Sequence, residues 1–179
     1  MFSAAPRPVR HRRIPWRAVV AVGLGLSLLA GCNTLDEQQR KWIFQPSDRT
    51  WWGGLAAAEG MDDAWIDFHS RATGEKVRLH GLWLAQARAD APVLLYLHGG
   101  PGMPTYFLNR KYPTGLEEDF TAVWWGQRGA GLSYDSKIPP VTMTVEQIIA
   151  DTLAVTDYLR SRFGKEKIYL MGHSWGSLI

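Results

Sequence analysis

A sharp strand-to-helix turn at residues 172–176, with the sequence Gly-His-Ser-Trp-Gly, constrains what this chain can fold into more than any other feature. It directly follows an apolar run, Lys167–Met171, that is typical of a buried strand. The backbone of such a turn passes so close to the central serine that the positions two before and two after it need glycine. The Ser174 hydroxyl would then project at the top of a sheet, where a base could reach it. The pattern therefore predicts a catalytic nucleophile at Ser174.

Composition narrows the class of protein. At 179 residues with nine tryptophans, the chain is long enough and apolar enough for one packed domain. Its net charge of +3 arises from five arginines within the first 31 residues, which contain no acidic side chain. The remaining residues hold 15 basic and 17 acidic side chains, so we expect no nucleic-acid partner.

The first 31 residues have the layout of a secretory signal. A basic stretch ends at Arg17, and the apolar run over 18–30 is too short to span a bilayer comfortably. The sequence Leu-Ala-Gly-Cys at 29–32 resembles the bacterial lipobox, in which the cysteine becomes the lipidated first residue of the mature protein. We therefore expect a signal peptide over 1–31 and a lipid on Cys32. That lipid would hold the protein on a membrane of the bacterial cell envelope, at the outer membrane or the periplasmic face rather than in the cytoplasm. The alternative is a free cysteine after an uncleaved anchor helix.

The rest of the chain divides into a polar tether and extension over 32–63 and a partial domain over 64–179. Alternating apolar residues near the start of this domain predict an antiparallel hairpin of two strands, at 65–68 and 77–84. Three continuous apolar runs predict strands that are buried on both faces, at 93–97, 120–125 and 168–171.

Two helices are predicted between these buried strands. The first covers 105–119 and is interrupted by a proline. The second covers 144–163 and begins at a capping box formed by Thr144 and Gln147. Its apolar positions, Leu153 among them, lie on one helical face. A hairpin followed by alternating strands and helices predicts an α/β fold with a mainly parallel central sheet.

The loops after the parallel strands would share one edge of the sheet, where ligands bind in such folds. The loop His98–Gly102 is rich in glycine, which lets backbone N–H groups face a ligand. We expect the N–H groups of Gly100 and Trp175 to form an oxyanion hole. His98 could serve as a general base, but its place at the end of a buried strand favours a role in holding the loop by side-chain hydrogen bonds. The next loop carries Arg128, whose fork of donors could fasten adjacent loops.

Three ordered motifs resemble the α/β-hydrolase fold, in particular its prolyl iminopeptidase-like branch. They are His-Gly-Gly-Pro-Gly at 98–102, Gln-Arg-Gly-Ala-Gly-Leu-Ser at 127–133 and Gly-His-Ser-Trp-Gly-Ser at 172–177. Gly126 stands where that branch usually has aspartate. The resemblance implies a serine peptidase that acts on peptides with an N-terminal proline or small apolar residue, with no metal or organic cofactor. Two alternatives stay open: a carboxylesterase of the same fold, and a truncated, catalytically inactive lipoprotein.

The chain ends three residues after Gly176. In α/β hydrolases the acid and the histidine that complete the catalytic machinery come later in the sequence than the nucleophile. We therefore expect the N-terminal half of the fold, truncated after the turn at Ser174. Without a base, the serine stays a weak nucleophile, so we expect no turnover from these residues alone.

Cys32 is expected to be the lipidated mature N-terminus when the chain is expressed in a bacterial host. The basic stretch, the apolar run and the Leu-Ala-Gly-Cys sequence follow one another in the order that signal processing requires. Mass spectrometry of the mature terminus checks this expectation, with Cys32→Ser as the matched control for the lipid. An unmodified Cys32 on a chain that still carries residues 1–31 would contradict it.

Overall fold

The computed structural model describes residues 16–48 and 54–179. The chain divides into two compact units, the first ending at Asp36 and the second comprising Glu37–Ile179. The basic stretch of the predicted signal peptide, from Arg7 to Arg13, lies outside the described residues. The Cys32 side chain lies outside them as well.

Helix α1 (Trp16–Phe44) continues through the predicted processing site, where the backbone of Cys32 is helical. Residues 33–44 are rich in Leu, Glu, Gln, Arg and Lys, which are good helix formers. This composition explains a helix where the sequence analysis expects a polar tether. Among residues 16–48 and 54–179, no helix is both long enough and apolar enough to cross a bilayer.

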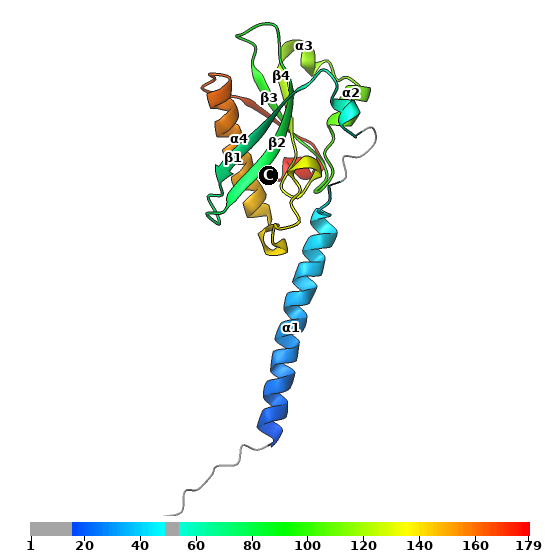
Figure 1. Cartoon of the computed structure of the whole chain (residues 1–179), viewed down its shortest axis with the longest axis vertical. Helices are drawn as coiled ribbons and strands as arrows, with labels where there is room; N and C mark the ends of the chain where they lie inside the picture. Colours follow the sequence, from blue (N-terminus) through cyan, green and yellow to red (C-terminus); the bar gives the residue numbers. More distant parts are fainter. Residues whose placement is uncertain (1–15, 49–53) are drawn as a thin grey trace, which may run out of the picture. The chain divides into compact units, whose positions relative to one another are not determined.

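The second unit is built on a mixed sheet with the strand order β1-β2-β4-β3-β5 (Figure 1). The strands are β1 (Asp62–His69), β2 (Lys76–Leu84), β3 (Val93–Leu97), β4 (Thr121–Trp125) and β5 (Tyr169–Gly172). β1 and β2 form the predicted antiparallel hairpin, and β2 pairs antiparallel with β4. β3 lies parallel to both β4 and β5. The predicted α/β fold is confirmed, with the β2–β4 pair joining the hairpin to the parallel part.

Both faces of β3 and β4 are buried, as their apolar runs predict. The prediction of a buried strand is wrong for β5, whose residues are all exposed because β5 is an edge strand of the described sheet and pairs only with β3. Trp125 of β4 lies in the core that α4 (Val145–Arg162) covers. Trp124 alternates to the opposite face, where it packs with residues of α2 (Tyr106–Lys111). The expected interruption by a proline separates α2 from α3 (Leu116–Asp119). The helices thus cover the sheet on two sides and leave the carboxyl ends of β3 and β5 for the loops that follow them.

Helix α4 begins where predicted, because Oγ1 of Thr144 accepts a hydrogen bond from the Gln147 N–H at 3.1 Å. The expected capping box is incomplete, since the Gln147 side chain bonds Asp151 and Ser70 instead. The predicted apolar face is also shifted. Leu153 is half exposed, because polar Gln147 and Asp151 occupy part of the buried stripe of the helix.

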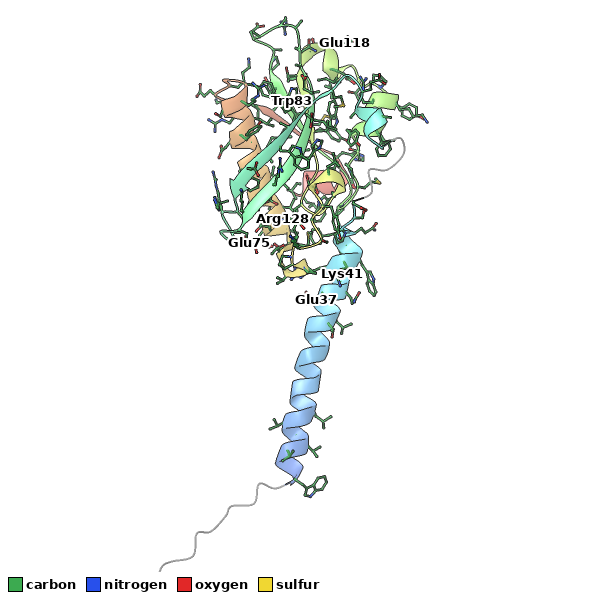
Figure 2. All side chains as sticks on the ribbon, in the orientation of Figure 1. Glu37, Lys41, Glu75, Trp83, Glu118 and Arg128 are labelled. Carbon is green, nitrogen blue, oxygen red and sulfur yellow. The ribbon has the colours of Figure 1, made fainter. Side chains whose placement is uncertain are left out.

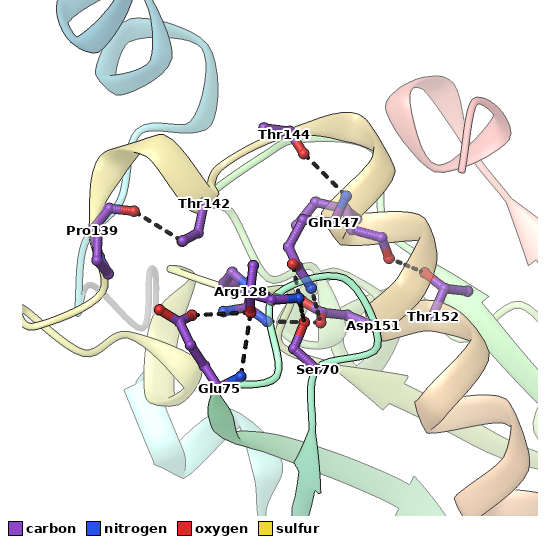
Figure 3. A network of polar contacts seen from close by, with 11 residues as sticks. Ser70, Glu75, Arg128, Pro139, Thr142, Thr144, Gln147, Asp151 and Thr152 are labelled. Atoms are coloured by element: carbon purple, nitrogen blue, oxygen red, sulfur yellow. Dashed lines mark hydrogen bonds and ion pairs between the residues drawn. The ribbon is translucent and has the colours of Figure 1, made fainter.

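A buried polar network joins the loop after β4 to helix α4 and to the β1–β2 turn (Figure 3). Arg128 donates from Nε and Nη2 to the two carboxylate oxygens of Asp151, both at 2.8 Å. Gln147 Nε2 donates to Oδ1 of Asp151 at 2.8 Å, and its Oε1 accepts from Ser70 Oγ at 3.1 Å. Arg128 and Asp151 are both buried, so the pair is a bidentate ion pair shielded from water. Arg128 therefore fastens its loop to α4.

Asp151→Asn is expected to lower the free energy of unfolding by about 3–5 kcal/mol, because it leaves the buried Arg128 guanidinium without a counter-charge. Asp157→Asn is the matched control. Asp157 pairs with Arg71 at 2.7 Å, but both side chains are exposed, so its loss should cost at most about 1 kcal/mol. Urea unfolding of both variants measures the difference, and equal losses would contradict the importance of the buried pair.

Candidate active site

The predicted turn follows β5 directly and places Ser174 in a strained conformation. Ser174 is the first residue of a short 3-10 helix, Ser174–Ser177, and its φ angle is +51°. This left-handed region costs a residue with a side chain on the order of 1–3 kcal/mol, so the surroundings must hold the serine there. Ser174 is also exposed. Both properties are those of a serine that a sharp strand-to-helix turn presents to a substrate.

Close backbone contacts require the two glycines of the turn. A Cβ atom on Gly172 would collide with the carbonyl group of Gly176. A Cβ atom on Gly176 would collide with the carbonyl oxygen of Leu97, the last residue of β3. The His173 N–H donates to that same oxygen at 3.2 Å. The turn is therefore packed directly against the end of the neighbouring strand.

The glycine-rich loop after β3 lies against the turn. A Cβ atom on Gly99 would stand 3.2 Å from Cβ of Ser174 and 2.6 Å from Nδ1 of His173, so a side chain here would force the segments apart. Among the described residues, no hydrogen bond uses the N–H of Trp175, whereas Gly100 pairs with Met103 in an isolated antiparallel bridge. The turn at Ser174 thus carries an unused backbone donor, which is what stabilisation of a developing oxyanion needs.

A cavity of about 420 Å³ opens beside Ser174. Aromatic, apolar and hydroxyl side chains line it, and the full lining is Tyr96, Gly99, Met103, Thr105, Leu108, Tyr112, Thr114, His173 and Ser174. Burial raises the pKa of Tyr96, so its phenol stays neutral at physiological pH. A cavity of this size and mainly apolar character suits a small substrate.

A larger cavity of about 990 Å³ lies along the β1–β2 hairpin, and neither Ser174 nor Gly100 lines it. Glu75 and Arg128 lie at the same end of the hairpin in Figure 2, and both belong to its lining. The charges of this lining are of both signs, and Arg128 is already paired with Asp151. The smaller cavity is therefore the better candidate for an active site.

His98 directly follows β3 and is buried, but it does not hold the loop in the expected way. It is 2% exposed, and neither ring nitrogen has a hydrogen-bond partner in the part of the chain that the structure describes. Burial lowers the pKa of His98 to about 4, and the backbone of Gly100 offsets part of that shift. The ring is therefore neutral at pH 7. It supports the loop by packing, and the prediction of side-chain hydrogen bonds is wrong.

The described residues place the candidate nucleophile Ser174 here but no base beside it. No hydrogen bond joins the Ser174 hydroxyl to an imidazole or a carboxylate within residues 16–48 and 54–179. The ring of the adjacent His173 lies against Gly99 instead. The same ranges hold no group of three or more His, Cys, Asp or Glu side chains that could bind a metal ion.

A hydroxyl fills the space beside Gly126, where the resemblance expects an aspartate. A Cβ atom on Gly126 would stand 2.7 Å from Oγ of Ser133. That oxygen accepts a hydrogen bond from the His80 N–H at 2.8 Å, which ties the loop to β2. Together with the Arg128–Asp151 ion pair, this bond holds the loop without an aspartate at position 126.

Two residues to which the sequence analysis assigns no role contact the Trp175 side chain. The indole Nε1 donates to Oε1 of Gln127 at 3.2 Å. The ring of Phe44 lies edge-on to the indole, with centroids 5.7 Å apart and planes at 87°. The place of Gln127 within a motif is a signal that could have pointed to it. Nothing in the local pattern around Phe44 points to Trp175.

Comparison with known proteins agrees with this architecture. Residues 92–179 match the family described as alpha/beta hydrolase fold, and the chain has that fold. The probable aminopeptidase YbaC of Bacillus subtilis (strain 168) is 51% identical over 88 residues, which are 49% of this chain and 28% of that protein. The chain therefore spans little more than a quarter of the length of this relative.

Two solved structures are also similar. The proline iminopeptidase-related protein TTHA1809 from Thermus thermophilus is 26% identical, with a TM-score of 0.48, and the match covers 66% of this chain and 38% of that one. A putative hydrolase from Agrobacterium vitis is 20% identical, with a TM-score of 0.49, and the match covers 65% of this chain and 41% of that one.

The free energy of unfolding is expected to fall as the pH drops, and His98 should account for part of the loss. Its pKa is about 4 in the folded protein against 6.5 in an unfolded chain, so the unfolded state takes up the proton first. The contribution of the neutral ring is complete above pH 6.5 and is lost as the pH falls to about 4. A shift of this size corresponds to about 3 kcal/mol.

Urea unfolding of the wild type and of His98→Phe at several pH values measures this contribution. The phenylalanine keeps a buried ring that cannot be protonated, so the variant should lose less stability between pH 6.5 and 4. Equal losses in the two proteins would show that His98 does not titrate as its burial requires.

Proposed function

We propose that this protein is a serine hydrolase in which Ser174 is the nucleophile. The observation on which the proposal rests is the φ angle of +51° at Ser174, beside a cavity and the unused N–H group of Trp175. Strain of this kind persists where the surrounding structure enforces it, and it gathers at active sites. The fold and the 51% identity to a probable aminopeptidase over 88 residues support the same function.

In the proposed reaction, Oγ of Ser174 attacks an acyl carbonyl of the substrate while a base takes its proton. The N–H groups of Gly100 and Trp175 stabilise the negative charge that develops on the carbonyl oxygen. The amine or alcohol then leaves, and water hydrolyses the acyl-enzyme. The strained turn fixes Ser174 relative to these donors, which lowers the entropic cost of reaching the transition state. The reaction requires a histidine and an acid that the described residues do not place beside Ser174.

The substrate that we propose first is a peptide with an N-terminal proline or a small apolar residue, as for a prolyl iminopeptidase. The name of the relative as a probable aminopeptidase supports this class, and so does the apolar part of the cavity around Met103 and Leu108. The second candidate is a carboxylesterase. It is favoured by the described lining of the cavity, which offers no carboxylate to pair with the free amine of a peptide.

We also propose that a lipid on Cys32 holds the enzyme at the bacterial cell envelope. The order of the basic stretch, the apolar run and Leu-Ala-Gly-Cys supports this location. Several acyl chains on one cysteine would give a stable anchor. The partners of the protein would then be a membrane and a small peptide or ester substrate.

Ser174→Ala is expected to abolish hydrolysis and to leave the fold intact. Loss of a covalent nucleophile lowers turnover by on the order of 10⁶, as it does for subtilisin. The protein as expressed from its gene is assayed on a proline arylamide and on a short-chain aryl ester, and circular dichroism checks the fold. The ratio of the two rates separates the peptidase from the esterase.

Ser161→Ala is the matched control, because Ser161 is an exposed residue of α4. If Ser174→Ala keeps more than a few per cent of the wild-type rate, Ser174 is not the nucleophile. If the wild type hydrolyses neither substrate and takes up no fluorophosphonate at Ser174, the alternative of an inactive lipoprotein is correct.

A further inference from the structure

The Trp175 indole is held from two sides by residues that lie far apart in the sequence. Gln127 accepts a hydrogen bond from its Nε1 at 3.2 Å, and the Phe44 ring packs against it in a T-shaped arrangement. Trp175 directly follows Ser174, and no hydrogen bond among the described residues uses its backbone N–H. A group that fixes this side chain therefore also restrains the position of that N–H.

Gln127 connects the turn to the glycine-rich loop. Its side-chain Oε1 accepts from the Trp175 indole, and its Nε2 makes a long hydrogen bond to the His98 carbonyl oxygen at 3.5 Å. The residue is 1% exposed, so these contacts are shielded from water. A carboxamide offers an acceptor and a donor on one rigid plane, which few other side chains can do. One side chain thus spans the two segments that carry the N–H groups of Gly100 and Trp175.

Phe44 belongs to a segment that we call the N-terminal strap, residues 40–47. Its ring is buried, and the carbonyl oxygens of Phe44 and Gln45 would each stand 2.5 Å from a Cβ atom on Gly102. The Ser47 N–H donates to the Gly129 carbonyl at 3.0 Å, and the Ser47 carbonyl accepts from the Gly131 N–H at 3.1 Å. The strap therefore touches both loops beside the site, although it lies outside residues 92–179, which match the hydrolase family.

We infer that Phe44 and Gln127 are positioning residues for the oxyanion hole, which they hold in place through the Trp175 side chain. The inference rests on the proposed function and adds to it a contribution from the N-terminal strap. Neither side chain lines the 420 Å³ cavity. Both therefore act on the transition state through the placement of a backbone donor and not through contact with the substrate.

Removing the contacts of Phe44 or Gln127 with Trp175 should cause a selective loss of transition-state stabilisation. An oxyanion hole works because its donors already point to the place where charge develops, so a small displacement weakens the transition state more than the bound substrate. A misplacement of about 1 Å can lower the rate by about 10²-fold. Turnover should therefore fall when Trp175 loses its support, while binding of the uncharged substrate changes little.

The experiment compares Gln127→Met and Phe44→Leu with the wild type, in the protein as expressed from its gene. Methionine matches the shape of glutamine without its hydrogen bonds, and leucine keeps an apolar side chain at Phe44. Gln86→Met is the control for the first change, because Gln86 donates to the carbonyl groups of Glu117 and Phe120 instead. Trp42→Leu is the control for the second, since Trp42 lies on the same helix end and is 73% exposed.

Four quantities are measured for each protein: the concentration of active sites by complete fluorophosphonate labelling, kcat, KM, and the affinity for two inhibitors. One inhibitor is a trifluoromethyl ketone, which adds the serine oxygen to its carbonyl and places an oxyanion in the hole. The other is the matching trifluoromethyl carbinol, which forms no oxyanion. We expect kcat per active site to fall at least about 10-fold in both variants. Affinity for the ketone should fall in parallel, whereas KM and affinity for the carbinol should change less than about 2-fold.

Unchanged kcat per active site in both variants would overturn the inference, and so would equal losses of affinity for the ketone and the carbinol. A purely structural role would lower only the number of active sites. Failure of the proposed function is distinguishable, because Ser174→Ala would then keep its activity. If Ser174→Ala is inactive while Gln127→Met and Phe44→Leu behave as their controls, Ser174 is the nucleophile and the positioning role is wrong.

Discussion

The contact between Gly176 and the Leu97 carbonyl is the constraint on which the rest of the site depends. It leaves no room for a side chain, and it brings the turn at Ser174 against the end of β3. Because the glycine-rich loop begins at the next residue, the same contact sets the position of that loop relative to the serine. A larger residue at position 176 would separate Ser174 from the donors that the proposed mechanism requires.

The polar side chains around the site hold the loops to this contact. Arg128 and Asp151 form a buried ion pair between the loop after β4 and helix α4. Gln127, which precedes Arg128 in the same loop, accepts a hydrogen bond from the Trp175 indole in the turn. Burial of such groups is unfavourable unless each is satisfied, and here the pair is bidentate and Gln147 adds a further bond to Asp151. These bonds fasten the loop after β4 to α4 and to the turn at Ser174.

Local patterns in the sequence predict most of the fold. The runs at β3 and β4 predict strands with two buried faces, because their residues are apolar apart from Thr121 at the start of β4. Thr144 predicts the start of α4, since a hydroxyl at that position can bond a free N–H group of the first turn. The glycines on either side of Ser174 also predict a tight turn. The requirement at Gly172 is local, since a Cβ atom there would meet the Gly176 carbonyl, whereas that at Gly176 arises from Leu97 of β3.

The features that the sequence did not predict depend on contacts between distant segments. Leu153 is apolar but half exposed, because polar residues that bond across the fold take its place in the buried stripe of α4. His98 has no side-chain hydrogen bond among the described residues, which only its three-dimensional surroundings reveal. Phe44 meets Trp175 from the other end of the chain, and no periodicity connects the two. Long-range packing therefore decides the details of the site that local patterns leave open.

Because Phe44 contacts Trp175, the length of chain between Cys32 and Phe44 limits the distance from a lipid on Cys32 to the proposed catalytic site. Phe44 lies only 12 positions after Cys32 in the sequence. Even a fully extended chain of that length reaches about 43 Å, and a helical one about 18 Å. A lipid at Cys32 would confine the mouth of the cavity to a thin layer of solution above the bilayer. Such an enzyme would respond to the concentration of substrate in that layer and not to its average over the compartment.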